Sequence, residues 1–349
     1  MRELTIAGRR IADDSAPYCI AEISHNHLGS YALARAMVEV AARAGADAVK
    51  FQRRGHSTYA GLRAAGEVEY AALRQSRELG HYELQRLAAY ARELGLAFLC
   101  TAFDVESADV LRVVGVDAYK IASGDVTNLP LLRHAARLNR PILLSTGGCE
   151  FDAVWAAYWT LIDAGAEFAL LHCTSEYPVM PEHVNLRVIE TYRREFADTV
   201  IGFSSHVDRM WGPSLEVAAY ALGARIIEKH FTITPEINTG EHAFALDGLG
   251  LNRLVVALGT ASEALGDGQK RLLCAEAAGV LRLGKHLAYS RDLLAGAVLS
   301  ETHLAVLGGG AGVAPNRLAG FVGGVLTRDV RAGEAAREDD VQVALCPAS

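Results

Sequence analysis

Eight short apolar runs alternate with longer amphipathic stretches between residue 18 and about residue 232 of this 349-residue chain. The runs span residues 18–23, 48–52, 96–102, 118–123, 141–146, 168–173, 200–205 and 225–232. Their length and β-branched content predict strands, whereas stretches such as 32–44 and 82–94 have the period of helices and end at Gly45 and Gly95. Because an eightfold βα repeat closes most economically as a TIM (β/α)8 barrel, we predict this α/β fold.

A doubly wound open sheet is the competing architecture. It would need fewer strands and a glycine-rich phosphate loop after the first strand, whereas the polar residues His25, Asn26 and His27 stand there. After a helical stretch near 251–265 the sequence becomes glycine-rich and alternating, from about Lys285 to the end. We therefore expect a barrel domain over residues 1–280 and a small β-rich domain over residues 285–349.

The expected small domain contains a short internal repeat. Residues 291–296 (RDLLAG) recur as residues 328–333 (RDVRAG), and each copy precedes an acidic stretch that ends in Leu304 or Val341. We interpret the repeat as a duplication that forms related turns and strands. Chance similarity over a few residues is the alternative.

Net charge and hydropathy exclude several classes of partner. The formal net charge is -7, and the 34 Lys and Arg residues form no cluster, so we expect no nucleic-acid partner. No apolar run approaches the ~20 residues of a membrane span, and the N-terminus lacks a signal-peptide pattern. We expect a cytoplasmic protein with no membrane contact.

Polar residues stand at the ends of all eight predicted strands, where the active site of a TIM barrel forms. They are Glu22 with Asn26 and His27, Lys50 with Gln52, Thr101 with Asp104, Lys120 with Ser123 and Asp125, Ser145 with Thr146, His172 with Thr174, Ser204 with His206, and Glu228 with His230. A purely structural barrel has no reason to place so many polar groups at one end, so this end is the candidate site.

Two lysines and two histidines in this set suggest specific ligands. Lys50 and Lys120, near hydroxyl groups, suit a phosphate and a carboxylate, although each lysine could instead form a structural ion pair with Glu22 or Asp125. His206 and His230 end neighbouring strands, so both imidazoles could reach one Mn, Fe or Zn ion. A pair of hydrogen-bonded core histidines is the alternative.

Six ordered motifs at these strand ends resemble those of the N-acetylneuraminate (sialic acid) synthases, including the legionaminic and pseudaminic acid synthases. They are IAEI (20–23) with Asn26-His27, GADAVKFQ (45–52), YKIASGD (119–125), LSTGG (144–148), LHCTSEYP (171–178) and IEKHFT (227–232). The resemblance runs from about residue 4 to the C-terminus, and the terminal segment is similar to the family's SAF (antifreeze-like) domain.

The resemblance implies a homodimer in which each SAF domain covers the partner subunit's active site. It implies condensation of phosphoenolpyruvate with an N-acetylmannosamine-like aldehyde to give a nine-carbon keto sugar acid and phosphate, by carbon–oxygen cleavage. Lys50, Lys120, Ser123, Ser145 and Ser204 would bind phosphoenolpyruvate. His206 and His230 would bind a divalent metal, most simply Mn, with Mg, Co, Fe or Zn as alternatives.

The resemblance also assigns the remaining site residues. Glu22 would be the acid or base near the reacting carbons, with Lys50, Lys120 and Asp125 as further catalytic groups. The residues facing the sugar would be Asn26, Asp125, Tyr177 and Glu241.

Three departures from the family pattern bear on metal and acceptor. Ser205 stands where the family usually has Asp before the metal histidine, and the segment from Arg54 to Leu79 differs from the expected form. The SAF cation expected before a Pro-Gly is missing from the stretch 306–310 (VLGGG). Two other functions therefore stay open: a synthase of seven- or eight-carbon sugar acid phosphates, and a catalytically silent sugar-binding relative.

Overall fold

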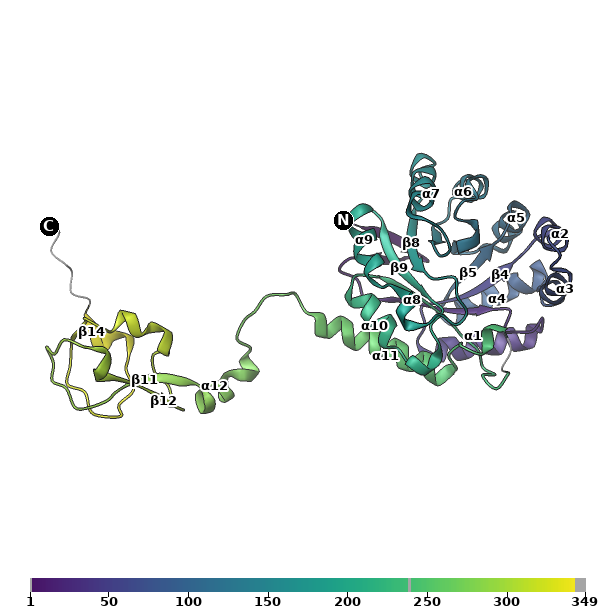
Figure 1. Cartoon of the computed structure of the whole chain (residues 1–349). Helices are drawn as coiled ribbons and strands as arrows, with labels where there is room; N and C mark the ends of the chain where they lie inside the picture. The colour runs from purple at the N-terminus through teal and green to yellow at the C-terminus, as the bar shows by residue number, and fades with distance from the viewer. Residues whose placement is uncertain (1, 238–239, 343–349) are drawn as a thin grey trace. The chain divides into compact units, whose positions relative to one another are not determined.

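The computed structural model describes residues 2–237 and 240–342, and the chain divides into two compact units, Met1–Gly266 and Asp267–Ser349. The first unit contains a closed barrel of eight parallel strands in the order β10-β3-β4-β5-β6-β7-β8-β9 (Figure 1). The strands are β3 (Tyr18–Ser24), β4 (Ala48–Arg53), β5 (Ala97–Ala102), β6 (Ala118–Ile121), β7 (Ile142–Ser145), β8 (Phe168–Cys173), β9 (Val200–Ser205) and β10 (Ile226–His230). The predicted TIM barrel is confirmed, and each predicted strand overlaps an observed one.

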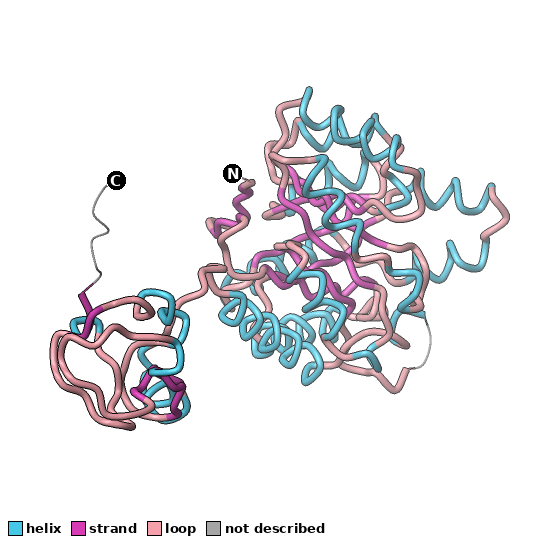
Figure 2. Tube along the Cα trace, turned by 60° about the vertical axis from the view of Figure 1, so that its left-hand side comes forward, coloured by secondary structure: helices cyan, strands magenta, loops and turns pink. Residues whose placement is uncertain are grey.

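Helices surround the barrel strands, which lie at the centre of the unit (Figure 2). They are α1 (Tyr31–Ala44), α2 (His56–Ala64), α3 (Val68–Ser76), α4 (His81–Glu93), α5 (Val105–Val114), α6 (Leu129–Ala136), α7 (Phe151–Asp163), α8 (Pro181–Val184), α9 (Arg187–Glu195), α10 (Ser214–Ala221) and α11 (Gly248–Leu265). The connection from β4 to β5 is unusual, because α2 and α3 precede α4 there. Within the described part of the chain, no helix has the length and apolar character needed to span a bilayer.

Local signals in the sequence set the ends of the helices. The Ser30 side chain accepts a hydrogen bond from the Leu33 N–H and so caps α1. Gly45 ends α1 with φ 87°, a left-handed conformation that glycine adopts without a steric penalty. Asp104 and Asp247 cap α5 and α11 in the same way as Ser30 caps α1. These caps explain why the predicted helix limits agree with the structure to within a few residues.

The N-terminal hairpin closes one end of the barrel. Strands β1 (Glu3–Ile6) and β2 (Arg9–Ala12) pair antiparallel, and their Leu4, Ile6 and Ile11 join a buried cluster with inward-facing residues such as Tyr18 and Ile20. This apolar cluster fills the end of the barrel at which the strands begin. Polar groups inside the barrel can therefore reach solvent at the opposite end, where the strands finish.

The second unit has its own small core. Its elements are α12 (Ala277–Leu283), β11 (Lys285–Tyr289), β12 (Leu304–Gly308), β13 (Val325–Leu326) and β14 (Val341–Gln342). The repeated segments pair with each other: the Ala295 N–H donates to Asp329 Oδ1 and the Ala332 N–H to Asp292 Oδ1, both at 2.8 Å. The copies therefore form related turns, as predicted from the repeat. The predicted domain limits near residues 280 and 285 stay a prediction.

Candidate active site

A cavity of about 640 Å³ lies at the C-terminal ends of the barrel strands. Side chains alternate along each strand, so every second residue faces the barrel interior. On β4 this places Ala48 in the apolar cluster and Lys50 at the cavity, and on β10 it places Ile226 in the cluster and Glu228 at the cavity. The inward-facing residues thus change from apolar to polar along the strands, and the polar layer forms the site.

Nearly all of the predicted site residues line this single cavity. They are Glu22, Lys50, Lys120, Ser123, Asp125, Ser145, Tyr177, Ser204, His206, His230 and Glu241. Asn26 is the exception, because it is buried outside the cavity and its Nδ2 donates a hydrogen bond to the Phe231 carbonyl at 3.0 Å. This hydrogen bond joins the ends of β3 and β10, and the expectation that Asn26 faces the sugar stays a prediction.

Lys50 is held between two buried carboxylates. Its Nζ lies 2.5 Å from Glu22 Oε2 and 3.5 Å from Glu228 Oε1, and it donates to Thr101 Oγ1 at 2.9 Å. Burial raises the pKa of Glu22 to about 7, although Lys50 opposes that shift. Burial also acts to raise the pKa of Glu228, but Lys120 and Lys50 outweigh it and lower the value to about 2. The pKa values of two neighbouring carboxyl groups are thereby moved in opposite directions.

Lys120 is paired more loosely than Lys50. Its nearest carboxylate is Glu228, whose Oε1 lies 3.8 Å from the lysine Nζ. Burial lowers the pKa of Lys120, and the field of Lys50 adds to the effect. Ser145 also lines the cavity and its buried Oγ has no hydrogen-bond partner in the structure. Buried polar groups without partners are uncommon, so Lys120 and Ser145 fit a polar ligand.

His206 and His230 lie side by side at the ends of β9 and β10, with ring centroids 5.3 Å apart. Tyr177 packs on His206 at 4.0 Å between centroids, and Phe244 packs on His230 at 5.0 Å. Nδ1 of His206 is 2.8 Å from the Thr174 carbonyl, which can only accept, so Nδ1 carries the proton and Nε2 is free to bind a metal. Nδ1 of His230 lies 3.4 Å from Glu241 Oε2 and has no hydrogen-bond partner.

This donor set fits a metal that takes few protein ligands. Among the described residues, no group of three or more His, Cys, Asp and Glu side chains is arranged to hold a metal ion. The two imidazoles with unused nitrogens would therefore leave several coordination positions to water and substrate.

Ser205, which stands where the family usually has Asp, does not line the cavity. Its Oγ donates to Glu216 Oε1 at 2.6 Å and accepts from Lys229 Nζ at 3.1 Å. Lys229 also pairs with Glu216 at 2.9 Å, and all three residues are buried. Glu216 on α10 supplies the negative charge beside Lys229. The Ser205 side chain therefore belongs to a buried polar cluster that includes the ion pair of Lys229 and Glu216, rather than to the cavity beside His206.

Sequence reasoning missed several cavity residues on the side of β4 and β5. They are Arg54, Thr58, Tyr70, Arg74 and Phe103. Tyr70 and Arg74 come from α3, and Arg74 Nη2 lies 2.7 Å from Glu241 Oε1. The available signal was that the segment 54–79 departs from the family pattern. Its helices could not be placed at the cavity without the tertiary structure.

Fold and site together define a (β/α)8-barrel enzyme with a charged cavity at the strand ends and a small β-rich C-terminal unit. The profile of the NeuB family matches residues 37–270, and that of the SAF domain matches residues 286–342. The chain belongs to the NeuB family and carries an SAF domain.

Relatives with known names cover nearly the whole chain. The N,N'-diacetyllegionaminic acid synthase of Campylobacter jejuni is 33% identical over 332 residues, which cover 91% of this chain and 98% of the relative. The N-acetylneuraminate-9-phosphate synthase of Homo sapiens is 32% identical over 90% of both chains. The crystal structure of an N-acetylneuraminic acid synthetase from Leptospira borgpetersenii, with citrate, superposes with a TM-score of 0.73 at 30% identity, covering 80% of this chain and 95% of that one.

Proposed function

We propose that the chain condenses phosphoenolpyruvate with an N-acetylmannosamine-like aldehyde, giving a nine-carbon 3-deoxy-2-keto sugar acid and phosphate. The observation that carries the proposal is a single cavity lined by Lys50, Lys120, Ser145 and Ser204, with His206 and His230 beside them at the ends of β9 and β10. The first group suits a small molecule that carries both a phosphate and a carboxylate. The named relatives that make legionaminic and sialic acids support the same chemistry.

His206 and His230 would hold the divalent ion, with Mn as the first choice. When bound, such an ion polarises a carbonyl group. In the proposed step the π electrons of the phosphoenolpyruvate double bond form a bond from its methylene carbon to the aldehyde carbon. This leaves a positive charge at the enol carbon, and the aldehyde oxygen takes a proton from solvent. Lys50 and Lys120 keep the phosphate and carboxylate in place while this bond forms.

Glu22 would act in the second half of the reaction. Water adds to the former enol carbon, and loss of phosphate through carbon–oxygen cleavage then gives the ketone. A carboxyl group with a pKa near 7 can take the proton from that water at neutral pH. Lys50, 2.5 Å away, stabilises the ionised form. The proposed homodimer, with each SAF domain over the partner subunit's site, would keep bulk water away during formation of the carbon–carbon bond, before the single reacting water adds.

A seven- or eight-carbon sugar acid phosphate synthase and a silent sugar-binding protein are the alternatives. A silent protein has no need for Glu22, Lys50, Lys120, His206 and His230 in one cavity, yet all five line it.

The test is to incubate the protein with phosphoenolpyruvate, Mn and a panel of hexosamines while measuring phosphate and keto-acid formation. His206→Ala and His230→Ala should be folded by circular dichroism but inactive. Full turnover of chelator-treated enzyme without added metal would refute the metal assignment, and no turnover with any sugar would refute the function.

A further inference from the structure

Arg54 is the one cavity-lining cation without a carboxylate partner within 4.0 Å in the described part of the chain. The other three are paired: Lys50 with Glu22 at 2.5 Å, Arg74 with Glu241 at 2.7 Å and Lys120 with Glu228 at 3.8 Å. Arg54 is only 8% exposed, and its buried Nη1 has no hydrogen-bond partner. A buried Nη1 without a partner has lost its hydrogen bonds to water and has gained none from the protein, unless a ligand binds.

The guanidinium of Arg54 is held on two sides. Its carbon lies 3.8 Å from the centroid of the Phe103 ring, and its Nη2 donates to Gln52 Oε1 at 3.1 Å. Gln52 Nε2 donates to Glu22 Oε1 at 2.8 Å, and this contact turns the amide oxygen of Gln52 toward Arg54. Stacking and one hydrogen bond thus fix the plane of the guanidinium, while Nη1 stays available.

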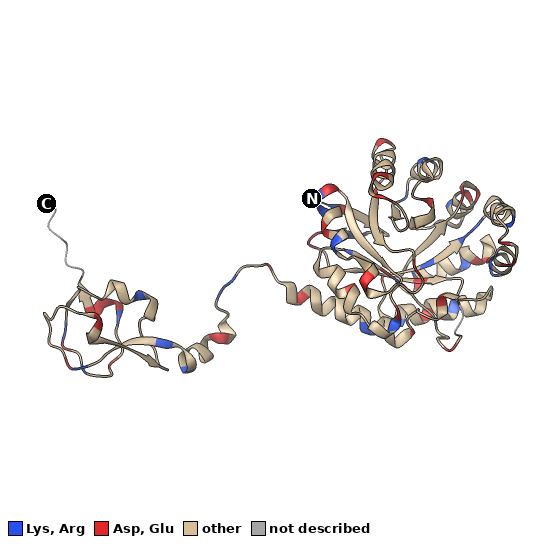
Figure 3. Cartoon of the chain, viewed as in Figure 1, with Lys and Arg blue, Asp and Glu red and all other residues tan. Residues whose placement is uncertain are grey.

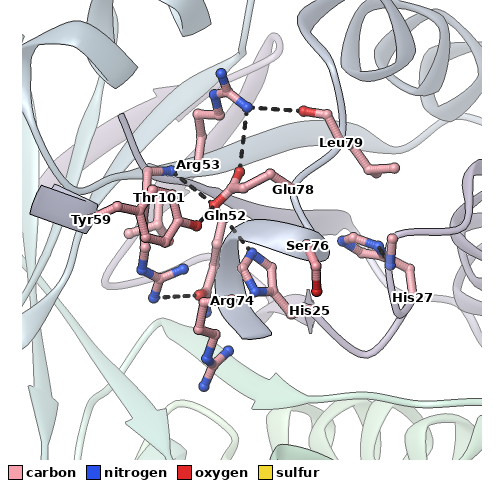
Figure 4. Close-up of polar contacts among 12 residues, drawn as sticks. His25, His27, Gln52, Arg53, Tyr59, Arg74, Ser76, Glu78, Leu79 and Thr101 are labelled. Atoms are coloured by element: carbon pink, nitrogen blue, oxygen red, sulfur yellow. Dashed lines mark hydrogen bonds and ion pairs between the residues drawn. The ribbon is translucent and has the colours of Figure 1, made fainter. Parts of the chain in front are cut away.

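The backbone at Arg54 is fixed by Glu78, which follows α3. The Arg54 N–H donates to Glu78 Oε1 at 3.2 Å, and the same carboxylate accepts from Tyr59 and is approached by Arg53 and His25 (Figure 4). This cluster ties the start of the α2–α3 segment to its end. Figure 3 shows Lys and Arg interspersed with Asp and Glu along the chain.

The order of the strands tells which part of an acceptor would meet Arg54. Arg54 follows β4 and stacks on Phe103, which follows β5, whereas His206 follows β9. In the eight-stranded order, β5 is opposite β9. If the aldehyde of the acceptor faces His206 and His230, the far end of the sugar chain therefore extends toward Arg54.

We propose that Arg54 is a specificity-determining residue that binds an oxyanion, a phosphate or a carboxylate, at the end of the acceptor remote from its aldehyde. This proposal rests on the proposed function. Lys50 and Lys120 are engaged by phosphoenolpyruvate in that function, so a second anionic group needs a cation of its own. Asp125 also lines the cavity, after β6, and burial raises the pKa of its carboxyl group. A guanidinium fork matches both kinds of oxyanion.

The test compares three acceptors in the full-length enzyme with phosphoenolpyruvate and Mn: N-acetylmannosamine, its 6-phosphate, and the corresponding 6-carboxylate. Keto-acid formation gives kcat/KM for each. We expect the wild type to favour one of the two anionic acceptors, and Arg54→Gln to lower that preference about 10- to 100-fold, the range expected for one charge-assisted contact. Arg54→Lys should retain part of the preference for the anionic acceptor. Arg133→Gln, which removes an exposed charge on α6, should leave the preference unchanged.

Calorimetry distinguishes a failure of the Arg54 proposal from a failure of the proposed condensation reaction. Calorimetry measures binding of the favoured anionic acceptor with saturating phosphoenolpyruvate and no metal. If no sugar is turned over, binding of both the 6-phosphate and the 6-carboxylate is measured. Weaker binding by Arg54→Gln than by Arg133→Gln supports the anion site even in the absence of turnover. Equal binding by both variants, or an acceptor preference that Arg54→Gln does not change, overturns the proposal and leaves the condensation reaction standing.

Discussion

Removing one partner of the buried pair of Lys229 and Glu216 should strongly destabilise the barrel. Lys229 has no exposed surface, and its Nζ lies 2.9 Å from Glu216 Oε1. It points away from the cavity because its neighbours Glu228 and His230 on β10 face inward. Glu216→Gln would leave the Lys229 charge buried with neutral partners. Breaking such a pair costs about 3–5 kcal/mol, which corresponds to a fall in melting temperature of roughly 6–20 °C for a domain of this size.

Urea unfolding followed by circular dichroism measures this loss, with Glu263→Gln on α11 as the matched control. Glu263 is exposed, so its loss should change the free energy of unfolding by less than about 0.5 kcal/mol. Ser205→Asp combined with Glu216→Gln should recover much of the stability, because residue 205 also contacts Lys229. A loss below about 1 kcal/mol for Glu216→Gln, or no recovery in the double variant, would refute this account of the serine.

Three further predictions concern the reaction. Lys120→Ala should weaken phosphoenolpyruvate binding by about 1–3 kcal/mol in calorimetry, and unchanged affinity would make this lysine structural. Phosphoenolpyruvate labelled at the bridging oxygen should transfer the label to phosphate, and label in the keto acid would contradict carbon–oxygen cleavage. Since the base form of Glu22 is required and its pKa is raised to about 7, kcat/KM should fall as the pH drops below about 7. A wild-type profile flat from pH 6 to 8 would exclude Glu22 as that base.

Much of the site followed from the sequence because the side chains of a strand alternate. The residues Glu22, Lys50 and Glu228 each stand near the end of an apolar run, and the barrel brings all eight ends to one rim. Asn26 does not line the cavity, because it lies beyond the end of β3, in a turn where the period of two no longer predicts the direction of a side chain. Its amide instead meets the Phe231 carbonyl.

The sequence by itself determined the barrel, the small C-terminal unit and most of the polar rim, because these depend on local periodicity, helix caps and ordered motifs. The tertiary structure decided which charges are paired. It placed Glu216 beside Lys229 although Ser205 occupies the expected carboxylate position. It also brought Arg54 to the cavity and left its guanidinium without a carboxylate partner in the described part of the chain. Such contacts join residues far apart in sequence, and their energies depend on burial and distance, which local patterns do not encode.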